Sequence, residues 1–151
     1  MKTLPVADTE FVFGMRSSDS KHEYVRSILE ELERAYPDRK KELTIPPLAL
    51  FEVVIVCMSQ GKGIDTIIET LEIINDIISR YKLAILEFNT GQFVKGLAVY
   101  GDFKTGFFDS LMAGSALAHD SIIIGDDEAF LNIAGLKRKT FRQYLEELRN
   151  R

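Results

Sequence analysis

Five acidic residues stand at positions where their carboxylates could share one site, namely Asp8, Glu52, Asp109, Asp126 and Asp127. Carboxylates that gather in one place favour Mg²⁺ or Mn²⁺, because these ions prefer oxygen ligands. An ion held in this way can lower the pKa of a bound water molecule and stabilise negative charge on a scissile phosphate. The chemistry that these residue types indicate is metal-dependent hydrolysis of a phosphodiester.

Short apolar runs alternate with helical patterns along the chain. Strands are expected at 4–7, 43–45, 83–88 and 122–124. Helices are expected at 25–36, 48–59, 64–81, 92–100, 107–119, 128–133 and 140–150, with a loop at 101–106. The segment 48–59 is apolar nearly all round, which is typical of a buried helix. The alternation predicts an α/β fold with three layers, α/β/α, around a short central parallel sheet.

The expected connectivity brings most of the acids to one edge of this sheet. Ligands of an open parallel sheet bind beyond the carboxyl ends of its strands. Asp8 follows the first strand, and Asp126 and Asp127 follow the last. Asp109 lies in the first turn of the helix that leads into that last strand and must run antiparallel to it. These acids are therefore expected to lie side by side.

Glu52 is the most unusual of the acids, because its helical neighbours are apolar. A buried carboxylate without a partner is unfavourable and becomes protonated. Glu52 therefore needs either an arginine or a metal ion. The other acids also have ordinary interpretations: Asp8 as a cap, Asp109 as a favourable charge at a helix N-terminus, and the Asp126–Asp127 pair as a solvated turn. Their joint placement favours the metal site.

Basic residues could line the rim of such a site. The candidates are Arg16, Lys21, Lys104, the run 137–139 and Arg142, although each could equally be a solvated surface charge. Phosphate contacts made by such residues would make nucleic-acid binding dependent on salt. The net charge of −4 argues weakly against binding nucleic acid through bulk positive charge, but it does not exclude contact through metal ions.

Length and composition predict one domain that covers residues 1–151. No apolar run is long enough to span a membrane, and the first residues do not form a signal-peptide pattern. Cys57 is the single cysteine, which excludes an internal disulfide, and we expect it to be buried. These features predict a cytoplasmic protein that is not bound to a membrane.

Four stretches resemble the PIN domain family, in particular its small VapC-like ribonuclease toxins, over nearly the whole chain. The apolar strand that ends in Asp8-Thr9 is similar to the family's opening D-T/S-N/S pattern. The segment IPPLALFE resembles the family's strand, turn and helix that end in a glutamate, here Glu52. The stretch FFDSLMAGSALAHDSIII is similar to the D-A-L-h-A-A-x-A helix, where h is apolar, and its following strand. GDDEAF resembles T-x-D-x-x-F, with Asp127 and Phe130 in register.

The resemblance implies an endoribonuclease that depends on Mg²⁺ or Mn²⁺ and uses Asp8, Glu52, Asp109 and Asp127, here called the acidic quartet. In such enzymes a metal-activated water attacks the RNA phosphodiester in line. The resemblance also implies a homodimer and, for a toxin, a small antitoxin protein that blocks the site.

The chain departs from the family pattern at three positions next to the quartet. Glu10 replaces a small polar residue, Gly125 replaces a threonine, and Asp126 adds an acid. Glu10 or Asp126 could serve as an additional ligand or could repel its neighbours. These departures motivate an alternative, a PIN-like domain with little or no activity that binds RNA or a protein. A phosphoacceptor domain fits less well, because its acid pair would follow the first strand instead of the last.

Overall fold

The computed structural model describes residues 4–151, and over these residues a five-stranded sheet forms the centre of the molecule. The strands are β1 (Val6–Ala7), β2 (Thr44–Ile45), β3 (Ala84–Ile85), β4 (Ile122–Ile124) and β5 (Lys137–Lys139). Their order is β3-β2-β1-β4-β5, and every neighbouring pair is parallel. β1 and the last two residues of β4 are fully buried, as expected for the middle of a covered parallel sheet.

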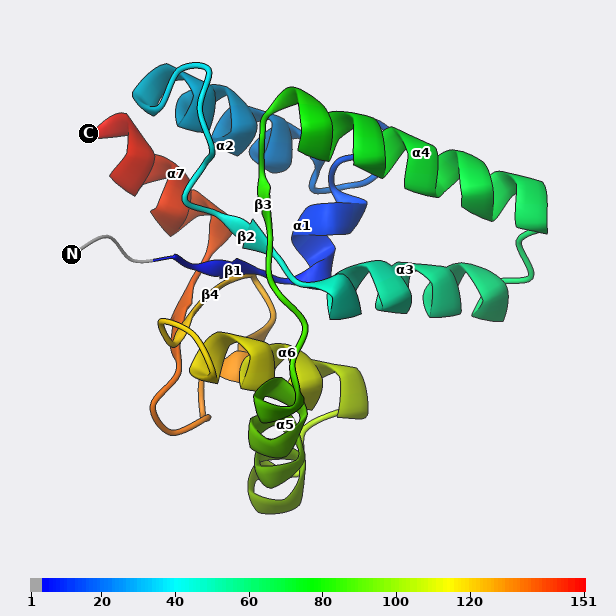
Figure 1. Ribbon diagram of the computed structural model, residues 1–151, viewed down its shortest axis with the longest axis vertical. Helices are drawn as coiled ribbons and strands as arrows, with labels where there is room; N and C mark the ends of the chain where they lie inside the picture. The colour runs from blue at the N-terminus through cyan, green and yellow to red at the C-terminus, as the bar shows by residue number, and fades with distance from the viewer. Residues whose placement is uncertain (1–3) are drawn as a thin grey trace.

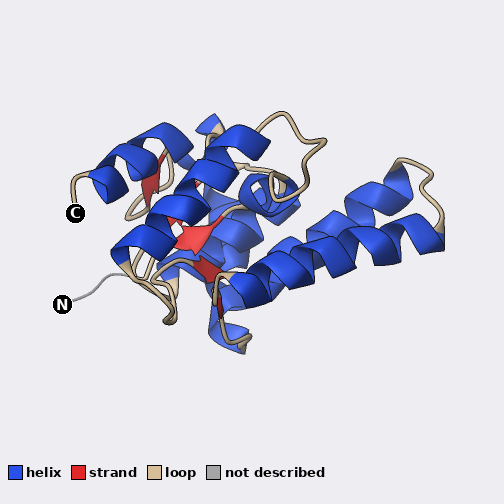
Figure 2. Ribbon diagram, turned by 90° about the horizontal axis from the view of Figure 1, so that it is seen from above, coloured by secondary structure: helices blue, strands red, loops and turns tan. Residues whose placement is uncertain are grey.

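Helices cover both sides of the sheet, so the predicted α/β fold with a parallel sheet is confirmed. They are α1 (Thr9–Phe13), α2 (His22–Ala35), α3 (Pro47–Ser59), α4 (Ile64–Arg80), α5 (Thr90–Phe103), α6 (Phe107–Leu117), the short 3₁₀ helix η1 (Glu128–Phe130) and α7 (Phe141–Arg149). Figure 1 shows α2 and α7 on one side of the sheet and α5 and α6 on the other. α3 and α4 form a hairpin that projects away from the sheet in both ribbon views (Figures 1 and 2). No helix in residues 4–151 is long and apolar enough to cross a membrane.

Three local predictions were wrong. The basic run 137–139 is an additional edge strand, β5, which pairs with β4. The expected loop at 101–106 begins too early, because α5 continues through Gly101 to Phe103. A glycine inside a helix lowers helix propensity only by about 1 kcal/mol, and packing against a neighbour can overcome this.

The third wrong prediction is the burial of α3. Its side chains Phe51, Ile55 and Met58 are 59%, 39% and 56% exposed. α3 contacts α1, α4 and α6 but belongs to the projecting hairpin, so part of its circumference meets solvent. Cys57 lies on the covered side and is buried, as predicted.

The close crossing of α5 and α6 fixes the helix that carries Asp109. A Cβ atom built on Gly114 would lie 2.3 Å from the backbone nitrogen of Gly96. Only glycine at both positions lets the two helix backbones approach so closely. The start of α6 is thereby held at the carboxyl edge of the sheet, where β1 and β4 also end.

Candidate metal centre

Asp8 lies at the carboxyl end of β1 and is only 4% exposed. Its backbone N–H donates a hydrogen bond of 2.9 Å to the carbonyl of Ile124, which continues the pairing of β1 with β4. A Cβ built on Gly125 would lie 2.8 Å from the Cβ of Asp8, so the Asp8 side chain packs directly against that backbone. The pKa of Asp8 is raised to about 8, mainly by burial and also by the negative charges of Glu10, Glu52 and Asp109, although a hydrogen bond from the backbone of Thr9 lowers it.

Glu52 lies on the part of α3 nearest the sheet and is half-buried. The hydroxyl of Thr9, at the start of α1, donates a hydrogen bond to its Oε2. Burial raises the pKa of Glu52, the hydrogen bond from Thr9 lowers it, and the charges of Asp109 and Asp127 raise it. Thr9 thus orients the carboxylate of Glu52 toward the end of β1.

Asp109 lies in the first turn of α6, where the helix dipole favours a negative charge. Burial and the nearby charge of Asp127 raise the pKa of Asp109. Asp127 caps η1, and its Oδ1 accepts a hydrogen bond of 2.9 Å from the N–H of Ala129. The turn after β4 and the start of α6 therefore meet, as the connectivity predicts.

The members of the acidic quartet lie close enough together for their charges to interact. Each of Asp8, Glu52 and Asp109 has a raised pKa to which another member of the quartet contributes. In residues 4–151, however, no three Asp, Glu, His or Cys side chains are gathered tightly enough to hold one metal ion. Mutual repulsion between carboxylates favours this looser arrangement.

Asp126 lies in a different environment from the residues of the acidic quartet. Its Oδ2 forms an ion pair of 2.6 Å with the Nζ of Lys21, and its Oδ1 accepts a hydrogen bond of 2.9 Å from the N–H of Phe141. Both carboxylate oxygens are thus engaged with the protein. The sequence predicted Asp126 as a metal ligand, whereas in the structure its carboxylate forms contacts within the protein.

The three basic residues predicted for the rim of the metal site lie in different environments. Lys21 is paired with Asp126, as described. The guanidinium of Arg16 lies 5.1 Å from the centre of the Phe13 ring, and its Nε is buried without a hydrogen-bond partner. Lys104 is exposed at the C-terminus of α5, with a left-handed backbone conformation (φ 53°).

The remaining basic candidates form contacts within the protein. Arg138 donates a hydrogen bond of 2.8 Å to the carbonyl of Asp126, and Lys139 forms an ion pair of 2.8 Å with Glu147. Arg142 pairs with Glu146 one helical turn away. Arg138 thus connects β5 to the turn after β4, Lys139 connects β5 to α7, and the pair Arg142–Glu146 lies within α7.

The quartet suits a divalent cation by the chemistry of its donors. Its members offer carboxylate oxygens at one edge of the sheet, and within residues 4–151 none of them forms an ion pair with a basic side chain. A carboxylate as buried as that of Asp8 stays charged at neutral pH only with a cation beside it. Mg²⁺ or Mn²⁺ would satisfy this set, whereas the absence of a cysteine or histidine from it disfavours zinc.

Thr9 gained a role that the sequence had not indicated, and Glu10, which the sequence offered as an additional ligand or a repelling charge, lies near the quartet. Thr9 holds Glu52, and the signal for it was its place in the Asp8-Thr9 pair. Glu10 is half-buried, and burial raises its pKa, as do the charges of Asp126 and Asp127, whereas Lys21 lowers it. Glu10 therefore belongs to the same electrostatic environment.

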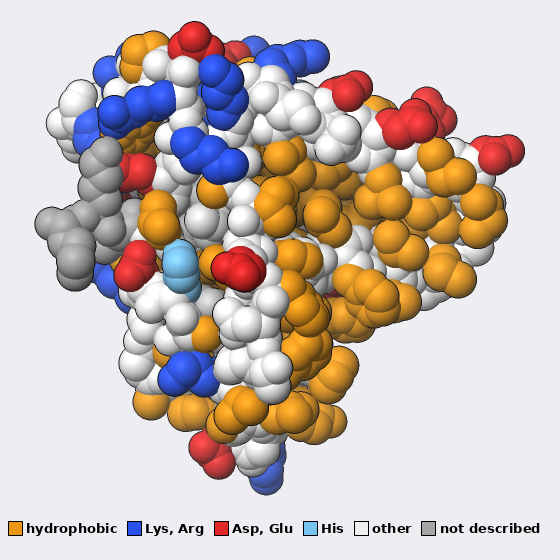
Figure 3. Space-filling view, viewed as in Figure 1, with side chains coloured by type: hydrophobic (Ala, Val, Ile, Leu, Met, Phe, Trp, Pro, Cys, Tyr) orange, Lys and Arg blue, Asp and Glu red, His pale blue; other side chains and the backbone are white. Residues whose placement is uncertain are grey.

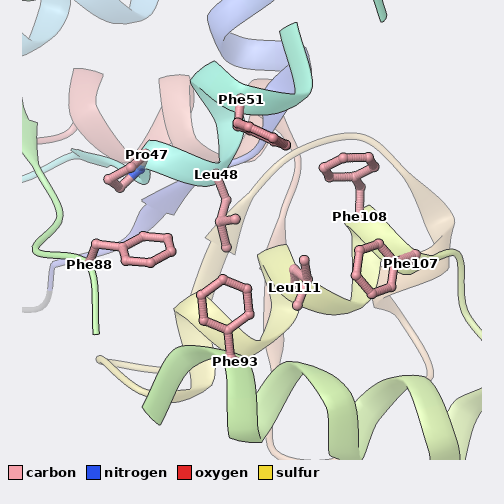
Figure 4. Close-up of a pocket in the computed structure, with 8 residues that line it drawn as sticks. All are labelled: Pro47, Leu48, Phe51, Phe88, Phe93, Phe107, Phe108 and Leu111. Carbon is pink, nitrogen blue, oxygen red and sulfur yellow. The ribbon is translucent and has the colours of Figure 1, made fainter. Parts of the chain in front are cut away.

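An apolar groove lies beside the candidate site. It has a volume of about 290 Å³ and is lined by Pro47, Leu48, Phe51, Phe88, Phe93, Phe107, Phe108 and Leu111, which we call the aromatic groove (Figure 4). The rings of Phe51 on α3 and Phe108 on α6 are 6.5 Å apart, and these residues directly precede Glu52 and Asp109. Figure 3 shows that apolar side chains continue over the α3–α4 hairpin and over the region of α5 and α6.

Comparison with known proteins finds the same arrangement of elements elsewhere. The model of the PIN domain family matches residues 6–136. Similar solved structures include VapBC2 from Rickettsia felis bound to a DNA fragment from the promoter, which is 17% identical with a TM-score of 0.64 over 89% of this chain and 96% of that chain. VapBC-1 from nontypeable Haemophilus influenzae is 14% identical with a TM-score of 0.64, over 91% and 97%.

A third similar structure is PAE2754 from Pyrobaculum aerophilum, which is 13% identical with a TM-score of 0.66 over 99% of this chain and 97% of that chain. Among curated protein sequences no significant match is found. At identities this low, the structural similarities establish the shared fold.

Proposed function

The chain belongs to the PIN domain family, a family of nucleases, and from this membership we propose that it is a VapC-like toxin that hydrolyses RNA phosphodiesters with Mg²⁺ or Mn²⁺. One observation carries the proposal: Asp8, Glu52, Asp109 and Asp127 share one electrostatic environment at the carboxyl edge of the sheet. Such an arrangement is unfavourable for a merely structural site, because each carboxylate destabilises the charge of the others.

In this proposal the carboxylates of the acidic quartet would hold the metal. When bound, the metal would supply an activated water and neutralise charge on the scissile phosphate. Thr9, which directly follows Asp8, donates a hydrogen bond to the carboxylate of Glu52 and thereby holds it beside the end of β1. Asp109 remains at the start of α6, and Asp127 is held at the N-terminus of η1 through the N–H of Ala129.

We propose that the chain acts in the cytoplasm together with an antitoxin protein. Two of the similar structures, which carry the name VapBC, support the antitoxin. A further similar structure is described as a toxin–antitoxin complex from Klebsiella pneumoniae. It is 16% identical, with a TM-score of 0.56 over 87% of this chain and 94% of that chain. An antitoxin would keep the nuclease inactive by covering its acidic site.

We also propose that two copies of the chain associate through the aromatic groove. All eight lining residues are apolar, and Phe51, Phe88 and Phe107 are about half exposed. An apolar patch of this kind on a monomer marks an interaction surface. A second copy is the occupant that the resemblance implies, and its own groove would supply the matching apolar surface in a two-fold symmetric contact.

RNA cleavage tests the proposed reaction. The wild-type chain is expected to cleave RNA when Mg²⁺ or Mn²⁺ is added and to stop when a chelator is added. Asp109→Asn should reduce cleavage at least about 100-fold, a loss typical of removing a group that acts in the transition state. Asp102→Asn, an exposed position on α5, is the matched control and should cleave like the wild type. Cleavage that survives the chelator, or that survives Asp109→Asn, would contradict the proposal.

A second candidate is a PIN domain that binds RNA or a protein without turnover. Glu10 favours it, because this additional acid lies near Asp126 and Asp127 and adds negative charge where an RNA phosphate would approach. RNA binding with no cleavage in either metal would support this candidate over the first.

A further inference from the structure

The carboxylate of Asp126 joins three segments that are far apart in the sequence. Its Oδ2 pairs with the Nζ of Lys21, which precedes α2, at 2.6 Å. Its Oδ1 accepts the N–H of Phe141, the first residue of α7, at 2.9 Å. Asp126 itself follows β4. One side chain therefore connects the start of α2, the end of β4 and the start of α7.

The same contacts hold the turn that carries Asp127. The carbonyl of Asp126 accepts a hydrogen bond from Arg138 at 2.8 Å, and the N–H of Gly125 donates to the carbonyl of Lys139 at 3.0 Å. Hydrogen bonds of the backbone and contacts of the Asp126 side chain therefore both hold the turn 125–127 in place. Asp127 is the residue of this turn whose charge acts on Glu52 and Asp109.

Lys21 is also held in place by a hydrogen bond within its own loop. Its backbone N–H donates to Oδ1 of Asp19 at 2.9 Å, so the loop before α2 presents its ammonium group to Asp126. The ion pair with Asp126 raises the pKa of Lys21, and the charge of Lys21 partly offsets the rise in the pKa of Glu10 that burial and the neighbouring acids cause. Lys21 is thus the basic side chain that offsets negative charge beside the quartet.

We propose that the Lys21–Asp126 ion pair positions Asp127 for metal binding, so that Asp126 is a positioning residue and not a ligand, and Lys21 is its partner and not an RNA contact. The inference rests on the proposed metal-dependent function. It follows from the hydrogen-bonded turn, in which both oxygens of Asp126 are engaged with the protein, while the charge of Asp127 acts on the quartet.

The affinity of the RNA-free protein for Mn²⁺, measured by calorimetry, tests this proposal. Lys21→Met and Asp126→Asn each remove the ion pair, and Asn keeps an oxygen for the N–H of Phe141. Each variant is expected to weaken Mn²⁺ binding about tenfold, in the range found for residues that orient metal ligands. The double variant should be no weaker than either single one, because both remove the same interaction. Lys21→Arg should restore binding to within about twofold of the wild type.

A second ion pair of the same length provides the matched control. Lys82 pairs with Asp38 at 2.6 Å near the amino end of β3, at the opposite edge of the sheet. Lys82→Met should leave Mn²⁺ binding unchanged, and thermal unfolding without metal should show that all variants are folded.

Four outcomes would overturn the proposal. A large loss in Asp126→Asn with none in Lys21→Met would make Asp126 a ligand. Weaker RNA binding in Lys21→Met with unchanged Mn²⁺ binding would make Lys21 an RNA contact. Wild-type protein that binds no Mn²⁺ would remove the proposed function together with the inference, whereas normal binding in every variant would remove the inference alone.

Discussion

Asp8 and Gly125 are packed so closely that a Cβ atom at position 125 would lie 2.8 Å from the Cβ of Asp8 and 3.2 Å from its Oδ2. The PIN pattern that this chain resembles has a threonine at that position. In this chain the side chain of Asp8 takes up the space that a side chain after β4 would need. The glycine is therefore required by the position of Asp8 and not by an unusual backbone conformation.

Gly125→Ala is expected to destabilise the protein by about 1–3 kcal/mol, because the added methyl group must displace the buried Asp8 side chain. Urea unfolding measures the change. Gly101→Ala is the control, since a Cβ there meets nothing within 4 Å and alanine favours the helix. Gly101→Ala should be neutral or slightly stabilising. Equal stability of Gly125→Ala and the wild type would show that Asp8 can move freely.

The stability of the metal-free protein should fall as the pH rises from about 4 to about 8. The pKa of Asp8 is 3.8 when unperturbed and about 8 in the fold, so between these values the folded state holds a proton that the unfolded state releases. The stabilisation is complete below the lower value and is lost as the pH approaches the higher one. Each unit of the shift corresponds to about 1.4 kcal/mol.

Urea unfolding in chelator at pH 5 and pH 8 measures this pH dependence. Asp8→Asn should be less sensitive to pH and more stable than the wild type at pH 8, because it carries no charge to bury. Added Mn²⁺ should stabilise the wild type most at pH 8, where its ligands are deprotonated. A wild-type protein in chelator that is more stable at pH 8 than at pH 5 would contradict the prediction.

Thr9→Val is expected to raise the pKa of Glu52 further, because it removes the hydroxyl that donates to the carboxylate without changing the shape of the side chain. The carboxyl ¹³C shift of Glu52, followed through a pH titration, measures the effect. Mn²⁺ binding should weaken about tenfold, as for other residues that orient a ligand. Thr9→Ser keeps the hydroxyl and should behave like the wild type; an equal loss in both variants would point to packing instead.

Light scattering after size exclusion tests the association through the aromatic groove. The wild type is expected to be a dimer, and Phe88→Glu to be a monomer, because it places a charge in the contact. Leu131→Glu, at an equally exposed apolar position outside the groove, should remain a dimer: the two side chains are 50% and 55% exposed. A monomeric wild type that binds an antitoxin through this groove would assign the surface to that partner.

The sequence alone was sufficient for the order of β1 to β4 and of the longer helices, and for the edge of the sheet at which the acids meet. The strand 122–124 was predicted with its observed bounds, and its three-residue isoleucine run is a purely local signal. The meeting of Asp8, Asp109 and Asp127 follows from connectivity, because strand ends and helix starts must alternate in a parallel sheet. Glu52 was conspicuous because its helical neighbours are apolar, and the family motif placed it in the quartet, although local periodicity could not orient its helix.

Only the tertiary structure showed that the two neighbouring acids have different contacts. Asp126 and Asp127 are adjacent, so nothing local distinguishes them, yet Asp126 turns to Lys21, which lies 105 positions away. The exposure of α3 could also not be predicted from the sequence, and neither could the pairing of the basic run 137–139 with β4. The periodicity of a sequence indicates which residues are apolar, but it does not indicate which other element covers them. Such contacts depend on how distant segments pack, and only the folded chain brings those segments together.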